Sequence, residues 1–199
     1  MVPKKAITTI LVVIFLAALI GCNYKTGKDQ IPNGWFKAGS KPASYEIGIL
    51  KKEGKNGENA IYMKSIEKDI NGFGTIMQNF SADKYLGTRV RLSGYIKSND
   101  VIEWAGLWMR IDGAGNPPKM LGFDNMQNRP IKGTTNWKKY DVVLDVPSDS
   151  KSVNFGVLLT GTGEIRISDL NFEVVDKNVS TTNFNYPEAK EPVNLDFGK

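Results

Sequence analysis

The chain has no histidine and a single cysteine among its 199 residues. Without histidine, Ser-His-Asp catalysis, Cys-His catalysis and histidine-ligated zinc sites are excluded. One cysteine cannot form an intrachain disulfide or a thiolate metal cage, so an ordinary hydrophobic core must stabilise the fold. The chain also has little excess charge. Its net charge is +5, of which residues 22–199 carry +3, and this is too mild to indicate a nucleic-acid partner.

The single cysteine, Cys22, follows a short apolar segment near the start of the chain. Two lysines at positions 4 and 5, an uncharged run over residues 6–21 and small residues before Cys22 predict a secretory signal peptide over residues 1–21. Residues 19–22, Leu-Ile-Gly-Cys, resemble the lipobox of bacterial lipoproteins. That resemblance implies cleavage after Gly21 and acyl chains, such as palmitate, on Cys22. It also implies attachment by lipid to the extracytoplasmic face of the cell membrane.

A transmembrane helix with a buried cysteine is the alternative interpretation of this segment. The uncharged run over residues 6–21 is shorter than the ~20 residues that cross a bilayer core. A lone thiol at its end would have no structural use there. The signal-peptide interpretation is therefore preferred.

Polar segments flank the central part of the chain. Residues 22–33 contain Gly and Pro without periodicity and predict a flexible tether. Residues 177–199 form a polar tail, in which residues 192–198 resemble the opening strand of a β-sandwich module. An added edge strand, the stub of a second copy and a disordered tail all remain open for that segment. The folded domain is expected over residues 34–176.

The central part shows β periodicity almost throughout, with no helical pattern reaching ten residues. Short runs of β-branched and aromatic residues alternate with clusters of Gly, Asn, Asp and Pro. This pattern predicts an all-β, two-sheet antiparallel jelly-roll sandwich. The expected strands cover residues 45–50, 60–65, 74–80, 89–97, 106–112, 120–126, 139–146, 154–160 and 164–175, with a bulge near residues 168–169 in the last one.

Four stretches resemble the jelly-roll carbohydrate-binding modules of the galactose-binding-like group: residues 33–36, 74–80, 84–97 and 165–172. The resemblance implies a non-catalytic domain with a glycan ligand. Such modules often carry a structural calcium ion, but no ligand set is recognisable here, so no metal or cofactor is assigned. A looser likeness, at residues 104–110 and 123–127, is to a ligand-binding-type domain attached to bacterial transcription regulators. The sequence shows no helix-turn-helix, and a lipid anchor contradicts direct gene regulation.

The predicted binding site centres on Trp108. Alternation sends Leu107 and Met109 into the core and Trp108 to the opposite face. If residues 112–119 connect a hairpin, Arg110 lies opposite Asp124 and Trp108 lies opposite Met126. An aromatic ring can stack on the C–H face of a sugar, while charged and amide groups bond its hydroxyls.

Three further residues belong to this predicted site. Tyr95 has the same outward parity on the preceding strand, Trp104 lies in the expected loop before the Trp108 strand, and Gln78 projects into the cleft or braces its wall. If the face is instead covered, Trp108 is a core residue. In that case Arg110 and Asp124 form merely a cross-strand ion pair.

Three functions remain open from the sequence. The preferred one is a lipid-anchored domain that binds carbohydrate or another small polar ligand. The alternative is a structural or protein-interaction module of the cell envelope without a small ligand. The third is a glycoside hydrolase, whose two carboxyl groups would have to come from the available acids, Glu103, Asp112, Asp124, Asp141 and Asp145.

The lipid anchor is directly testable. We expect the Cys22→Ser variant to stay unprocessed and unlipidated, because acyl transfer needs the thiol. Intact-mass measurement of the protein from membranes checks this. A wild-type mass with a free thiol and no lipid would refute the predicted location.

Overall fold

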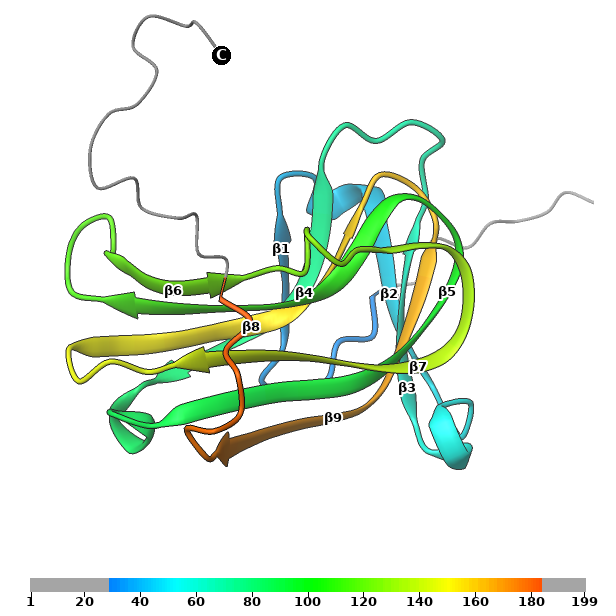
Figure 1. The fold of residues 1–199 in the computed structure, drawn as a ribbon. Coiled ribbons are helices and arrows are strands. Elements are labelled where there is room, and N and C mark those ends of the chain that lie inside the picture. The colour runs from blue at the N-terminus through cyan, green and yellow to red at the C-terminus, as the bar shows by residue number, and fades with distance from the viewer. Residues whose placement is uncertain (1–28, 184–199) are drawn as a thin grey trace, which may run out of the picture.

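The computed structural model describes residues 29–183 (Figure 1). The predicted signal peptide (residues 1–21), the lipidation residue Cys22 and the segment 192–198 lie outside the described residues. Among the described residues, no helix has the length and apolar character needed to cross a membrane.

The described part of the chain is built from strands, and its helices are limited to three 3-10 turns of three residues each. The all-β antiparallel prediction is confirmed. Several predicted strand bounds are matched closely, and β1 is an additional strand. The elements are β1 (Phe36–Gly39), η1 (Pro42–Ser44), β2 (Tyr45–Leu50), η2 (Lys55–Gly57), β3 (Ala60–Ser65), β4 (Phe73–Ser81), η3 (Asp83–Tyr85), β5 (Arg89–Gly113), β6 (Met120–Asp124), β7 (Ile131–Asp145), β8 (Ser150–Thr160) and β9 (Glu164–Val175).

Strand β5 joins the two layers of the sandwich (Figure 1). The sequence predicted two strands here, but β5 runs unbroken over 25 residues. Its first half, up to Asn99, pairs with β9 and with most of β7, whereas residues from Trp104 onward pair with β8. Between these parts the register with β7 shifts, and Asp100 adopts a positive φ of 50°. One curled sheet therefore supplies both layers.

Alternating side chains of both layers fill the core, as the sequence pattern predicted. In β5 the inward positions are Val90, Leu92 and Ile96 in the first half and Leu107, Met109 and Ile111 in the second, all essentially inaccessible to solvent. Their partners on β8 and β9 include Val157, Leu159, Ile165 and Ile167. The intervening positions of β5 are thereby left for the two outer faces.

An aromatic cluster packs against this core. Phe80, Phe155, Phe172 and Tyr85 contact one another with ring centroids 5.2–5.9 Å apart, and Trp35 meets Phe155 edge-on at 5.6 Å. These separations suit offset and edge-to-face aromatic contacts. Because Phe155 and Phe172 lie on β8 and β9, the cluster ties the two layers together. Trp35 is therefore a packing residue.

The predicted bulge in the last strand is confirmed. Opposite β5, Ser93 pairs with Asn171 but Tyr95 pairs with Ser168, so β9 has one extra residue. Asp169 lies at this point with a positive φ of 54°. The bulge lets Ile165 and Ile167 before it and Phe172 after it all contact the core, despite their opposite parity.

The described residues of the predicted tether and tail pack on the sandwich. At the start, Asp29 pairs with Lys37 at 2.5 Å and the Gln30 amide donates to the Ile47 carbonyl. At the end, the Thr182 amide donates to the Val143 carbonyl of β7. The folded unit therefore extends at least over residues 29–183.

A charge cluster holds the segment after β9. Arg89 donates from Nε and Nη2 to the two carboxylate oxygens of Asp145, each at 2.9 Å, and from Nη1 to the Lys177 carbonyl. Lys177 itself reaches Asp145 at 2.9 Å. The hydrogen bonds from Arg89, reinforced by Lys177, lower the pKa of Asp145 to about 2 although burial opposes the shift.

This shift predicts acid sensitivity. A carboxyl whose pKa is lowered by folding stabilises the protein above its unfolded pKa, and that contribution is lost as the pH falls from about 4 to about 2. We expect the Asp145→Asn variant to be less stable at pH 7 and to lose less stability over that pH range. Denaturant unfolding at several pH values checks this. Asp141→Asn, at an exposed position of the same strand, is the control and should follow the wild type.

Candidate functional site

The second half of β5 presents Trp104, Trp108 and Arg110 on one outer face. These residues alternate with Ala105, Leu107 and Met109, which are fully buried in the core. The sequence placed Trp104 in a loop, but it lies within β5 and pairs with Thr160 of β8. Trp104 and Trp108 are consequently held on the same strand and face, four positions apart.

A pocket of about 330 Å³ lies over this face. Pockets that hold small ligands start at about this volume and combine apolar walls with a few polar groups. Most of the wall here is aromatic or aliphatic. Among the described residues that line the pocket, Arg110 is the one that carries a charge. The lining residues are Phe73, Trp104, Trp108, Arg110, Phe123, Asn125, Leu158 and Thr160.

The indole of Trp108 is fixed by a hydrogen bond across the sheet. Its Nε1–H donates to Oγ1 of Thr75 at 2.8 Å, and the Thr75 hydroxyl donates to the Val157 carbonyl at 2.8 Å. Thr75 is buried, whereas Trp108 is half-buried. The ring therefore lines the pocket in a set orientation rather than rotating in solvent.

Gly106 separates Trp104 from Trp108 on this face. The chain at Asn125 and Met126 packs directly against it. A Cβ added to Gly106 would come within 2.9 Å of Met126 Cβ and 3.0 Å of the Asn125 carbonyl oxygen. This close approach brings Asn125 to the pocket, so the glycine is a packing requirement of the site.

Arg110 is positioned by a buried acid. Its Nε donates to Oδ1 of Asp112 at 2.7 Å, while Asn154 Nδ2 donates to Oδ2 of the same carboxylate at 2.9 Å. The Asp112 side chain is 9% exposed and that of Arg110 is 38% exposed. Both carboxylate oxygens are thus engaged, and the guanidinium extends from this pair to the pocket.

The predicted pairing of Arg110 with Asp124 is wrong. The hairpin from β5 to β6 exists, but Arg110 lies opposite Phe123 and Met109 lies opposite Asp124. The register shifts beyond Ile111, where β6 accommodates an extra residue, and this reverses which β6 side chains share the Arg110 face.

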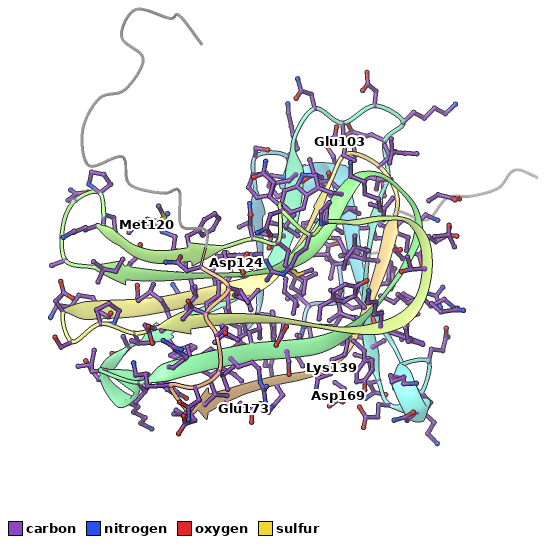
Figure 2. The ribbon with its side chains drawn as sticks, in the orientation of Figure 1. Glu103, Met120, Asp124, Lys139, Asp169 and Glu173 are labelled. Atoms are coloured by element: carbon purple, nitrogen blue, oxygen red, sulfur yellow. The ribbon has the colours of Figure 1, made fainter. Side chains whose placement is uncertain are left out.

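Asp124 instead belongs to the interior. It lies where β6 ends (Figure 2), is fully buried, and pairs with Arg129 at 2.6 Å. Its Oδ1 also accepts from the Met126 amide at 2.8 Å. Met126, predicted opposite Trp108, is fully buried, and its sulfur accepts a hydrogen bond from the Leu107 amide. Asp124 is therefore a structural residue of the turn after β6.

Tyr95 and Gln78 do not join the pocket. Tyr95 lies in the other layer, where it pairs with Lys139 of β7. The Lys55 Nζ lies over its ring, 5.6 Å from the ring centroid. Figure 2 shows Lys139 in the lower layer of the view, apart from Asp124 and Met120 in the upper one. Gln78 is on β4, opposite Phe155 of β8. It is on the same face of β4 as the buried Ile76, and Thr75 is on the other face. Its side chain approaches Gly34 rather than Trp108.

Five lining residues were not among the predicted site residues: Phe73, Phe123, Asn125, Leu158 and Thr160. The alternation of residues 153–160, with Val157 and Leu159 inward, already implied that Leu158 and Thr160 face outward. No sequence signal placed β4 and β6 beside them, because strand order depends on long-range pairing. No group of three or more Asp, Glu, His or Cys residues that could hold a metal ion occurs within residues 29–183.

Comparison with known sequences gives one strong similarity. The chain is 47% identical over 167 residues to a Bacillus subtilis protein described as the uncharacterized HTH-type transcriptional regulator YbfP. The match covers 82% of this chain and 56% of that regulator, so the chain spans little more than half of its relative's length. No family model matches the chain.

Solved structures show the same kind of fold at low identity. The enzymatically active domain of tailspike protein 4 from bacteriophage CBA120 superposes with a TM-score of 0.52 and 9% identity, over 72% of this chain and 20% of the tailspike chain. A CBM22-1 xylan-binding domain from Paenibacillus barcinonensis reaches a TM-score of 0.49 with 12% identity, over 76% of this chain and 91% of its own. Similarity at this level concerns the fold and not the ligand.

The Thr75–Trp108 hydrogen bond gives a stability prediction. Thr75→Val keeps the shape but removes the acceptor of the indole N–H, and the loss should be about 1–3 kcal/mol in the free energy of unfolding. Ser93→Ala is the matched control, because the buried Ser93 hydroxyl has no partner among the described residues. Denaturant unfolding should show little change for Ser93→Ala. Equal losses for both variants would mean that the hydrogen bond contributes nothing specific.

Proposed function

We propose that this chain is a lipid-anchored protein whose β-sandwich binds carbohydrate, or another small polar ligand of similar shape, without catalysis. The pocket between Trp104 and Trp108 is the binding site. The observation that carries the proposal is an indole fixed in orientation beside a pocket that also offers amide, hydroxyl and guanidinium groups.

The composition of the pocket suits a sugar. Pyranose rings have an apolar C–H face that packs on aromatic rings and a rim of hydroxyls that exchange hydrogen bonds with polar side chains. Trp104, Trp108 and Phe73 supply rings, while Asn125 and Thr160 supply polar atoms that both donate and accept. Because Trp108 is already held by Thr75, little side-chain freedom is lost when a ligand binds.

The placement of the acids supports a non-catalytic role. Glycoside hydrolysis needs two carboxyl groups across the scissile bond. No Asp or Glu is among the described residues that line the pocket. Asp124 and Asp145 pair with Arg129 and Arg89 away from the pocket, and Asp112 pairs with Arg110 without lining the pocket itself.

The anchor at Cys22 would keep the domain close to the membrane. Among the described residues the first contact with the sandwich is made by Asp29, and the chain from Cys22 to that residue can extend at most about 25 Å. A domain on so short a connection would sample ligands next to the extracytoplasmic membrane face. The support for this location is the lipobox-like sequence alone.

The regulator relative is compatible with ligand binding by the shared region. A match over 167 residues necessarily includes most of the sandwich. Residues 29–183 contain no α-helix and thus no helix-turn-helix, so the sandwich corresponds to another part of that relative. We infer that this sandwich binds a small ligand in the present, membrane-anchored chain.

A glycan array probed with the full chain in non-ionic detergent tests the function. We expect saturable binding to at least one glycan, and a loss of at least about tenfold in affinity for Trp108→Ala, as for an aromatic anchor at the centre of a site. The control is Tyr95→Ala, an aromatic residue in the other layer, which should bind as the wild type does.

Two outcomes would contradict the proposal. If no glycan binds, the interaction-module alternative replaces it, and the search moves to a protein partner. If a glycan binds but Tyr95→Ala and not Trp108→Ala abolishes binding, the site lies on the other layer.

A further inference from the structure

The guanidinium of Arg110 has one edge turned away from its ion pair. Its Nε donates to Asp112 at 2.7 Å. Among the described residues, neither Nη1 nor Nη2 of Arg110 has a hydrogen-bond partner, although the residue lines the pocket. We infer that the ligand of this pocket carries a carboxylate that pairs with Nη1 and Nη2, and that the preferred ligand class is therefore an acidic, uronate-containing sugar. This inference rests on the proposed function of the same site.

The free edge of the Arg110 guanidinium has the geometry to bind a carboxylate. A guanidinium presents planar pairs of N–H groups that match a carboxylate in a bidentate arrangement. Asp112 and Asn154 fix the Nε side, and the Asp112 side chain is too buried to turn toward the pocket. The Nη1–Nη2 pair is what remains for a ligand.

The described lining of the pocket carries a positive charge. Arg110 is the charged residue among the described lining residues, and no carboxylate accompanies it there. The hydroxyls of a neutral sugar donate as well as accept, and a carboxylate would be their strongest acceptor. A pocket with a guanidinium and no exposed acid favours a ligand that brings its own negative charge.

The spacing between the Trp108 ring and the Arg110 charge suits a single sugar residue. Trp108 and Arg110 are two positions apart on one face of β5, so their Cα atoms are separated by about 7 Å. A hexuronate has its carboxylate directly on the sugar ring, and a ring stacked on Trp108 would hold that group within reach of the Arg110 side chain. A single residue of an acidic glycan could thus contact both side chains.

The test compares each acidic oligosaccharide with its methyl ester, which keeps the sugar rings and removes the charge. Trimers of galacturonate, glucuronate and mannuronate and their esters are titrated calorimetrically against the full chain in non-ionic detergent. We expect at least one acid to bind about 10- to 100-fold more tightly than its ester, as for a hydrogen bond to a charged group.

Variants locate the effect. Arg110→Gln should abolish the preference for the acid, and Arg110→Lys should recover only part of it because the ammonium lacks the planar fork. The control is Arg91→Gln, which removes an arginine paired with Glu173 in the other layer and should leave binding unchanged. Thermal unfolding of each variant shows whether it is folded before its binding is compared.

The outcomes separate this inference from the proposed function. If acid and ester bind equally and Trp108→Ala weakens both, the pocket binds sugar but the inference is wrong. If the preference for the acid survives in both folded Arg110 variants, another cation recognises the ligand and the inference is also wrong. If no acidic or neutral sugar binds in a Trp108-dependent way, the proposed function fails together with it.

Discussion

The unbroken strand β5 is the constraint on which the rest of the structure depends. It exchanges backbone hydrogen bonds with β6, β7, β8 and β9, so both layers are joined through one segment. The bend beyond Asn99 decides which side chains can meet. The outward side chains before the bend, such as Tyr95, lie on one outer surface of the sandwich. Trp104, Trp108 and Arg110, which follow the bend, lie on the other.

The alternation of apolar residues predicted much of the fold. It sent Leu107 and Met109 inward and located the change of phase in β9, because a half-buried strand must repeat with a period of two. It also assigned Trp108 and Arg110 to the outer face correctly. These features follow from local sequence, since burial on one face decides the parity of each strand independently.

What the sequence could not predict depends on contacts between distant segments. Because β6 contains a single extra residue, Phe123 and not Asp124 lies opposite Arg110. A register shift of one residue cannot be predicted from the sequence of either strand alone. Likewise the local alternation turns both Tyr95 and Trp108 outward, but it does not show that β5 bends between them and places them in different layers. Gln78 was wrongly predicted to reach the Trp108 site. Its face of β4 is shared with Ile76 and lies beside Phe155 of β8, and this arrangement depends on the pairing of β4 with β8.

The pocket is held by strands rather than by mobile loops. Trp108 is oriented by Thr75 of β4, and Arg110 is oriented by Asp112, which Asn154 of β8 also holds. Both orienting residues are buried and absent from the pocket lining. For the ligand proposed above, the cost of ordering Trp108 and Arg110 is therefore met when the sheet folds rather than when the ligand binds. Under that proposal a change at Thr75 or Asp112 weakens binding through the orientation of its neighbour, so contact with the ligand is not the right measure of which residues determine its recognition.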